Sequence, residues 1–252
     1  MVAERVRDYA EKLRDDCSAL ISDLIEEQEK LDVIYNPLRY AWRPHSTFIE
    51  RFAGLGARTL MIGMNPGLGM GNTGIPFGCP VQVRDYLGIR DLEVDQPEMS
   101  HPKRVVLGLE QPRSEVSGRR IWSMLAELYG EPETAMSHVF IVNHCPLWMF
   151  NDQGQNITPD KLRGVVESRL RDICDEHLRE VVKAMGIERV IGVGNYAMQR
   201  ATTALAGRGL RIEKIPHPSP ASPLANRNGG ADWRAAVREV LPDIRASGSG
   251  RD

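Results

Sequence analysis

The sequence predicts an α/β fold, a three-layer α/β/α sandwich around a parallel sheet of about four strands. Short apolar runs at 59–64, 138–147 and 189–194, and a fourth run that begins at Arg211, have the length of buried strands. Amphipathic stretches with helical spacing separate these runs. Strands that alternate with helices form parallel sheets with both faces covered, so we expect helices on both sides of this sheet.

The first half of the chain predicts few regular elements besides the first strand. Apolar side chains at helical spacing over residues 3–30 predict an amphipathic N-terminal helix. The segment NPLRYAWRPH (36–45) is expected to be irregular and to pack its aromatic rings on the core. The stretch from Pro66 to about Ser117 is rich in glycine and proline, and it predicts mostly loop with one short helix near Val81–Leu87.

The second half is more regular and predicts one domain. Thr158 is expected to cap a long helix that has Pro159 at its first position and ends at Gly186. Other helices are expected at 118–130, near 195–205 and from about Asp232. We expect a single domain over residues 1–245, with an N-terminal helix (1–32) packed on it, and a disordered tail at 246–252.

Composition limits the classes of function. The chain has 252 residues, four cysteines and a net charge of −2, which argues against a broad basic surface. Arginines nevertheless gather between Arg200 and Arg234, and a local patch is sufficient for phosphate contacts. The cysteines and histidines lack metal-ligand spacing, so we expect free thiols, no metal and no cofactor. No apolar run spans a membrane and no signal peptide is evident, so the cytoplasm is the expected location.

Polar and aromatic side chains follow the predicted strands. Asn65 comes after the first strand, before a glycine-rich loop that contains Phe77, Asn143 ends the second, and His217 follows the fourth. The carboxyl ends of parallel strands share one edge of the sheet, where ligands bind. An asparagine amide both donates and accepts, so it can read a base that carries C=O and N–H groups. A histidine can stabilise a departing anion, and a phenylalanine ring can stack on a planar base.

The glycine-rich loop also fits a dinucleotide-binding pattern. Residues 69–74 read GMGNTG, which has the G-x-G-x-x-G spacing. Pro76 and Pro80 follow at once, and proline disfavours the helix that a dinucleotide fold requires there. An acidic residue near Asp91–Asp95 would support nucleotide binding, but the surrounding sequence does not resemble a buried strand. Nucleotide binding without catalysis is therefore the weaker alternative.

The ordered motifs resemble a known family. GMNPG, PFG, VRDYLGI, HPKR, SEVSG, CPL, GVG and HPSP, with YNPLRYAW before the first strand, are similar to the single-strand-selective monofunctional uracil-DNA glycosylases. The resemblance extends from about Tyr35 to Trp233. It implies the uracil-DNA glycosylase fold and hydrolysis of the N-glycosidic bond of uracil in single- and double-stranded DNA. It also implies activity on 5-oxidised uracils such as 5-hydroxymethyluracil.

The resemblance also implies roles for individual residues. Asn65 would orient the attacking water, and His217 would stabilise the departing uracil anion. The implied base-binding residues are Asn143, which reads the base edge, Phe77, which stacks on it, and the pocket residues Gly63, Met64, Gly67 and Met70. The expected DNA-binding residues are Pro218, Ser219, Pro220, Leu224, Asn226 and Arg227. The enzyme is expected to act as a monomer with DNA as its partner and no membrane.

The chain departs from the family pattern at two places. Ala221 and Ser222 stand where a bulky basic residue usually fills the gap left by the flipped base, so Leu224, Arg227 or Asn228 become candidates for that role. Leu68 and Gly71-Asn72 also differ from the usual first motif, which leaves open a wider pocket. A specificity for hypoxanthine or xanthine therefore stays an alternative, and so does a DNA-binding relative without activity.

Overall fold

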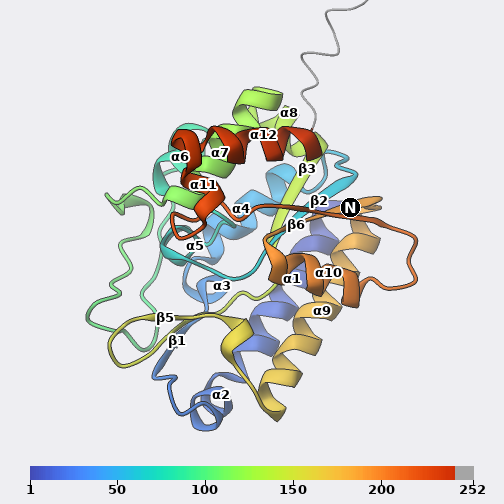
Figure 1. Cartoon of the computed structure of the whole chain (residues 1–252). Helices are drawn as coiled ribbons and strands as arrows, with labels where there is room; N and C mark the ends of the chain where they lie inside the picture. Colours follow the sequence, from blue (N-terminus) through green and yellow to red (C-terminus); the bar gives the residue numbers. More distant parts are fainter. Residues whose placement is uncertain (242–252) are drawn as a thin grey trace, which may run out of the picture.

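The main sheet has four parallel strands in the order β3-β2-β6-β7. The structure is a computed structural model that describes residues 1–241 (Figure 1). In the register of the central strand β2 with the edge strand β3, Gly63 lies beside Asn143. The strands are β2 (Thr59–Gly63), β3 (Val139–Asn143), β6 (Arg189–Val193) and β7 (Arg211–Ile215).

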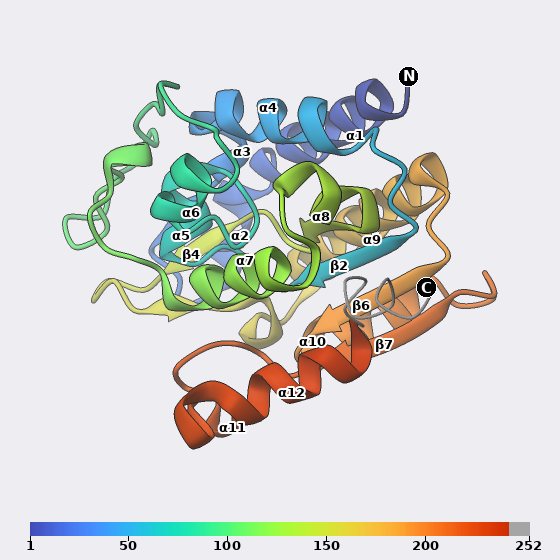
Figure 2. The ribbon, with the colours of Figure 1, turned by 90° about the horizontal axis from the view of Figure 1, so that it is seen from above.

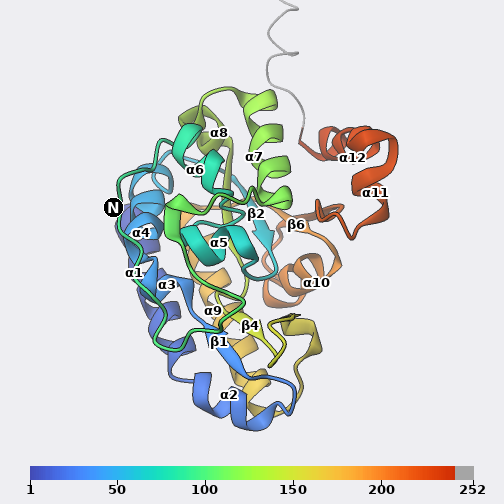
Figure 3. The same ribbon diagram turned by 90° about the vertical axis from the view of Figure 1, so that its left-hand side faces the viewer.

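Helices cover both faces of this sheet (Figures 1 and 3). One face carries α7 (Val116–Tyr129), α8 (Pro132–His138) and α12 (Ala231–Val240). The other face carries α1 (Val2–Ser18), α9 (Val165–Met185) and α10 (Asn195–Ala204). Seen from above, α12 runs alongside the edge strand β7 (Figure 2). The predicted three-layer α/β/α sandwich around four parallel strands is confirmed.

The N-terminal segment forms two helices, α1 and α2 (Ile21–Glu27), where one helix over 3–30 was expected. Side-chain donors at the end of α1 explain the break. The Nδ2 of Asn36 donates to the carbonyl of Arg14 at 2.9 Å, and the hydroxyl of Ser18 donates to the same carbonyl at 2.7 Å. These bonds compete with the next helical turn. The chain then turns, and α2 buries Leu24 in a second apolar cluster.

The expectation of irregular structure at 36–45 is wrong. The segment enters α3 (Pro37–Tyr40) and α4 (Trp42–Phe52). The Oδ1 of Asn36 accepts the amide of Leu38 at 3.1 Å, and Pro37 follows as the first helical residue. Phe48 and Phe52 are buried one helical turn apart, and the ring of Phe48 stacks on Phe140 at 5.3 Å. Tertiary packing therefore decides the structure of this segment.

The glycine-rich loop contains a helix that the sequence did not predict, α5 (Leu68–Thr73), which lies inside the G-x-G-x-x-G pattern. A Cβ on Gly71 would overlap the indole ring of Trp148, so glycine is required for this contact. Gly74 ends the helix at φ +71°. The acidic stretch after it, residues 88–107, contains no strand in the described structure. This arrangement does not support dinucleotide binding. Also present are the expected short helix α6 (Pro80–Asp85) and a 3₁₀ turn, Gly108–Glu110.

A second, antiparallel sheet was not predicted. Its strands, in the order β1-β4-β5, are β1 (Val33–Tyr35), β4 (Trp148–Phe150) and β5 (Asn156–Ile157). Tyr35, Trp148 and Phe150 pack edge to face on it, with ring centroids 4.7 to 5.8 Å apart. The sheet places β5 beside the carboxyl edge of the main sheet. It therefore supplies part of the site described below.

The long helix α9 begins after Gly164, so the expected cap at Thr158 is wrong. Thr158 instead precedes a 3₁₀ turn, Pro159–Lys161. The carboxylate of Glu27 accepts the first amides of α9, with distances of 2.7 Å from Val165 and 3.0 Å from Val166. This cap comes from another helix and leaves no local sequence signal. The described part of the chain ends in α11 (Pro223–Asn226), a 3₁₀ turn (Arg227–Gly230) and α12. The expected disordered tail at 246–252 lies outside the described residues.

Candidate active site

A cavity of about 310 Å³ opens at the carboxyl edge of the main sheet, between the loops that follow β2, β3 and β7 and the second sheet. The sheet register brings these loops together, because parallel strands end on the same side. The predicted site residues on its wall are Met64, Asn65, Gly67, Met70, Phe77, Asn143, His217 and Ser219. The convergence of the strand ends is therefore as expected, while the roles of the residues stay predictions.

Asn143 and Phe77 form one wall of the cavity. Asn143 is 7% exposed, and its Nδ2 donates to the sulfur of Met70 at 3.0 Å, a weak acceptor that a ligand could readily replace. The ring of Phe77 is half-buried. Gly63 lies behind both side chains, since a Cβ there would overlap the Oδ1 of Asn143 and lie 2.9 Å from the ring of Phe77.

The backbone of Phe77 is held in an uncommon conformation. Its φ is +53°, a region that bulky residues rarely adopt. The indole Nε1 of Trp122 on α7 donates to the carbonyl of Phe77 at 2.9 Å, and the amide of Cys79 donates to the same carbonyl at 2.8 Å. These contacts fix the loop so that the aromatic ring faces the cavity. Strain stored in this way is common at ligand sites.

Asn65 is oriented by its amide nitrogen. The Nδ2 donates to the carbonyl of Leu147 at 3.3 Å and contacts that of Pro66 at 3.4 Å. This arrangement leaves the Oδ1 as the acceptor that can bind a water molecule at the cavity wall. An amide cannot remove a proton from that water, so Asn65 can orient a nucleophile but cannot serve as its base.

His217 presents a neutral donor. The amide of Ser219 donates to its Nδ1 at 3.1 Å, so the ring proton resides on Nε2. Burial lowers the pKa of His217 below its ordinary value of 6.5, which keeps the ring neutral at pH 7. Behind the ring, Gly194 at φ +86° packs on His217, and a Cβ there would lie 3.4 Å from that of His217, in ordinary van der Waals contact. The arrangement suits donation to an oxygen that gains negative charge.

Several residues on the wall were missed by the sequence analysis. Glu115 lies on the wall, but its carboxylate accepts the amides of Ser117, at 2.9 Å, and Gly118 at the start of α7. Asn156 and Thr158 reach the cavity from the second sheet. The acidic residue ahead of an amphipathic helix could have been read as a helix cap. No signal in the sequence indicated that the second sheet would reach the site.

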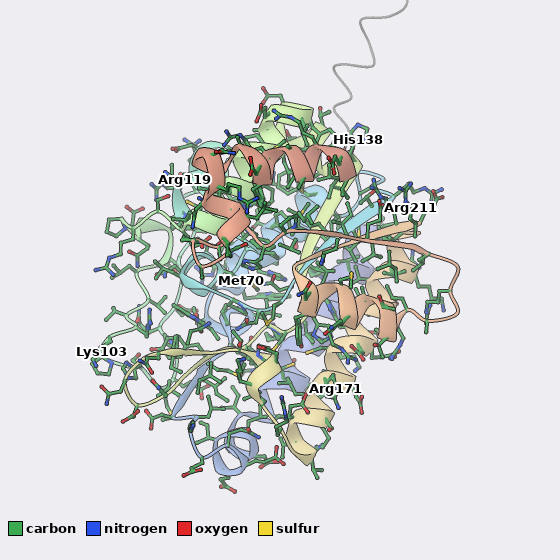
Figure 4. The ribbon with its side chains drawn as sticks, viewed as in Figure 1. Met70, Lys103, Arg119, His138, Arg171 and Arg211 are labelled. Carbon is green, nitrogen blue, oxygen red and sulfur yellow. The ribbon has the colours of Figure 1, made fainter. Side chains whose placement is uncertain are left out.

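Of the predicted DNA-binding residues, only Ser219 lines the cavity. Pro218 is buried, Leu224 is half-buried, and the exposed residues of this set are Pro220, Asn226 and Arg227. They belong to the segment between β7 and α12, which lies beside α7 (Figures 1 and 2). In the side-chain view, Met70 of the cavity lies near the centre of the molecule, below α11 (Figure 4).

Within residues 1–241, no group of three His, Cys, Asp or Glu side chains is arranged to hold a metal ion, and no helix is long and apolar enough to cross a membrane. The four cysteines are free and buried. Lys214 does not line the cavity, and its Nζ donates to the Oδ1 of Asn195 at 2.9 Å.

Comparisons with known proteins agree with this arrangement. The model of the uracil DNA glycosylase superfamily matches residues 51–241. The chain is 42% identical to the single-strand selective monofunctional uracil DNA glycosylase of Bos taurus, over 87% of this chain and 80% of that protein. It is 44% identical to the enzyme of the same name from Rattus norvegicus, over 86% of this chain and 77% of that protein.

A solved structure, that of SMUG2 from Pedobacter heparinus, is similar in fold. The TM-score is 0.60 at 19% identity, with 93% of this chain and 97% of that chain covered. At this identity the likeness concerns the fold alone. The curated relatives and the family model lead to one conclusion about the family. The chain belongs to the uracil DNA glycosylase superfamily and, within it, to the single-strand selective monofunctional family.

Proposed function

We propose that this protein is a monofunctional DNA repair glycosylase that hydrolyses the N-glycosidic bond of uracil and leaves an abasic site. The observation that carries the proposal is the neutral Nε2–H donor of His217 on the same cavity wall as the Asn143 amide and the Phe77 ring. A base paired inside a duplex cannot reach such a cavity. The target nucleotide must therefore be flipped out or already single-stranded.

The side chains divide the reaction between binding and bond cleavage. The flipped base stacks on Phe77, and its imide edge replaces the sulfur of Met70 as the partner of Asn143. The bond between the base nitrogen and the sugar carbon breaks, and the electron pair leaves with the base. His217 donates its Nε2–H to the oxygen where this charge accumulates. A water held by the Oδ1 of Asn65 attacks the cationic sugar carbon and loses its proton to solvent.

The absence of a lysine among the cavity-lining residues of the described chain supports hydrolysis without lyase chemistry. Strand cleavage by a lyase requires an amine that forms a Schiff base with the sugar. The amine of Lys214 is engaged with Asn195 outside the cavity wall. The product we expect is therefore an abasic site with both flanking phosphodiester bonds intact.

The room in the pocket bears on which modified bases the enzyme accepts. Gly67 lines the cavity, and a Cβ there would meet nothing within 4 Å, so the pocket has room for a substituent on the base. We therefore include 5-hydroxymethyluracil among the substrates. We also propose activity on single- and double-stranded DNA, a monomer, and one domain over residues 1–245. The working compartment would be the one that holds the DNA, the cytoplasm of a bacterium or the nucleus of a eukaryote.

Leu224 is the best candidate to fill the gap left by a flipped base. It is half-buried at the start of the short helix α11, so its side chain is held in place. Arg227 and Asn228 instead both contact Asp232, at 3.6 Å and 2.8 Å respectively. Replacing Leu224 by alanine should reduce excision from duplex DNA more than excision from single strands. An equal reduction on both would exclude this role.

The decisive experiment is base release from end-labelled oligonucleotides that carry one uracil, 5-hydroxymethyluracil, hypoxanthine or xanthine. Uracil release by the wild type, strongly reduced by His217→Ala, is the expected result. Release of the purines alone would overturn the specificity, and no release from any substrate would overturn the activity.

The pH dependence of the rate tests the protonation state of His217. Because burial lowers its pKa, uracil release should be constant through neutral pH and fall only below 6.5. Protonation of Nδ1 would break its bond from Ser219 and disturb the ring. A rate that rises as the pH falls through 6.5 would instead indicate a charged imidazolium donor.

A further inference from the structure

The backbone on both sides of His217 is held by side chains from two different helices. The carbonyl of Pro216 accepts the indole Nε1 of Trp233 at 2.8 Å, and the carbonyl of Pro218 accepts Nη1 of Arg120 at 2.6 Å. Trp233 belongs to α12 and Arg120 to α7. Trp233 therefore holds the peptide bond between residues 216 and 217, and Arg120 holds the one between residues 218 and 219. Because the prolines on either side also restrict the backbone, the segment that carries His217 is fixed before and after it.

Arg120 also holds the far end of the same loop. Its Nη2 donates to the Oδ1 of Asn226 at 3.0 Å, and the Nδ2 of Asn226 donates to the carbonyl of Pro220 at 2.5 Å. The guanidinium thus joins the residue after His217 to α11, across the segment 218–226. The planar, forked geometry of arginine suits two such acceptors at once. The charge of the Arg120 guanidinium is thus directed at these two acceptors.

We propose that Arg120 is the positioning residue for His217, with Trp233 holding the opposite peptide bond. The inference rests on the proposed function. By holding the carbonyl of Pro218, Arg120 keeps the amide of Ser219 in place to donate to Nδ1 of His217. That bond directs the ring proton to Nε2 and into the cavity. Arg120 does not line the cavity, so it acts on the reaction through His217.

The expected loss of rate in Arg120→Ala follows from the role of His217 as a preorganised donor. Loss of one donor to a developing oxyanion costs about 10²- to 10³-fold in rate. Removal of Arg120 loosens the donor without deleting it, so Arg120→Ala should reduce single-turnover uracil release by about 10- to 100-fold. Arg120→Lys retains the charge and one of the two contacts and should recover part of the rate. Asn226→Ala removes only the second contact and should have a smaller effect.

The experiment is a double-mutant cycle between Arg120 and His217, measured under single-turnover conditions. In the His217→Ala background, Arg120→Ala should change the rate by less than about threefold, because the group it positions is gone. Arg119→Ala is the matched control, since Arg119 is the exposed neighbour on α7 and should leave the rate unchanged. Thermal unfolding of each variant separates loss of activity from loss of structure.

The affinity for DNA distinguishes a positioning role of Arg120 from a direct contact between Arg120 and DNA. Affinity for an oligonucleotide with a tetrahydrofuran abasic site should change by less than threefold in Arg120→Ala. The contrary result is a lower affinity together with a shallower slope of log affinity against log salt concentration, by about the value of one phosphate contact. Arg120 would then bind DNA, and the proposal would be overturned. An undiminished rate in Arg120→Ala, or an equal loss with and without His217, would overturn it as well.

A readout that does not need activity keeps the two proposals separate. Nitrogen-15 shifts of the His217 imidazole should report one tautomer, with the proton on Nε2, in the wild type and in Arg119→Ala. In Arg120→Ala the two tautomers should mix, because the bond from Ser219 weakens. An unchanged tautomer in Arg120→Ala would contradict the positioning role even if the wild type releases no base, a result that would separately refute the proposed function.

Discussion

Gly63 offers a sharp test of the base-binding wall, because its missing side chain is where Asn143 and Phe77 meet. Gly63→Ala would place a Cβ 2.9 Å from Cε2 and Cζ of Phe77 and in overlap with the Oδ1 of Asn143. Carbon atoms prefer separations of about 3.5 to 4.0 Å, so the ring must retreat by at least about 0.6 Å. The amide oxygen is closer still and must move on the order of 1 Å. Both groups that we propose to contact the base are then displaced together.

A displacement of about 1 Å in a positioning group can reduce a rate by about 100-fold. We therefore expect Gly63→Ala to lower single-turnover uracil release by about that factor. The measurement is release from a single-stranded oligonucleotide, with Gly54→Ala as control, because a Cβ on Gly54 lies 3.9 Å from its nearest neighbour. A Gly63→Ala enzyme that stays folded and keeps more than half the wild-type rate would refute the proposed base contacts.

Three further predictions concern water positioning, substrate range and pH. Asn65→Asp, which keeps an acceptor oxygen, should lose less base-release activity than Asn65→Ala, and equal losses would count against the water-orienting role. Gly67→Ala should spare uracil but reduce release of 5-hydroxymethyluracil, because the added methyl group enters open space beside the base, and parallel losses on both substrates would contradict this. Burial lowers the pKa of His45 to about 4 and that of His177 to about 3, so the unfolded chain binds more protons between these values and 6.5. The free energy of unfolding in urea should therefore decrease as the pH falls from 6.5 towards 4, by about 1.4 kcal/mol per pH unit for each histidine. His177→Gln should reduce that slope by the contribution of one histidine, and a flat profile would show that these rings are protonated at no cost.

The strands of the main sheet could be predicted because their signal is local. The ranges 59–64, 138–147 and 189–194 each contain a short apolar run, and each contains a strand of the sheet. The elements that were missed depend on distant partners. The helix α4 is stabilised by packing such as that of Phe48 on Phe140, and α5 requires the close approach of Gly71 to Trp148. No window of sequence contains both members of these pairs.

The same distinction applies to the site. Asn65, Asn143 and His217 could be found because each follows a strand of one parallel sheet, and topology brings such positions together. Asn156 and Thr158 could not, because they reach the cavity from a second sheet whose strands are two or three residues long. Strands of that length carry too little periodicity to be recognised.

The chemistry of the cavity explains why so many contacts fix its backbone. Glu115 is an acidic residue on the wall, but its carboxylate is committed to the first amides of α7. Among the described residues that line the cavity, none is a free carboxylate that could act as a base beside Asn65. A reaction without a strong base depends on donors that are already in place when charge develops. The indole of Trp122 holds the carbonyl of Phe77, and the guanidinium of Arg120 holds that of Pro218. Both side chains come from α7, so one helix aligns the stacking ring and the anion donor, and a rigid shift of α7 would misplace both at once.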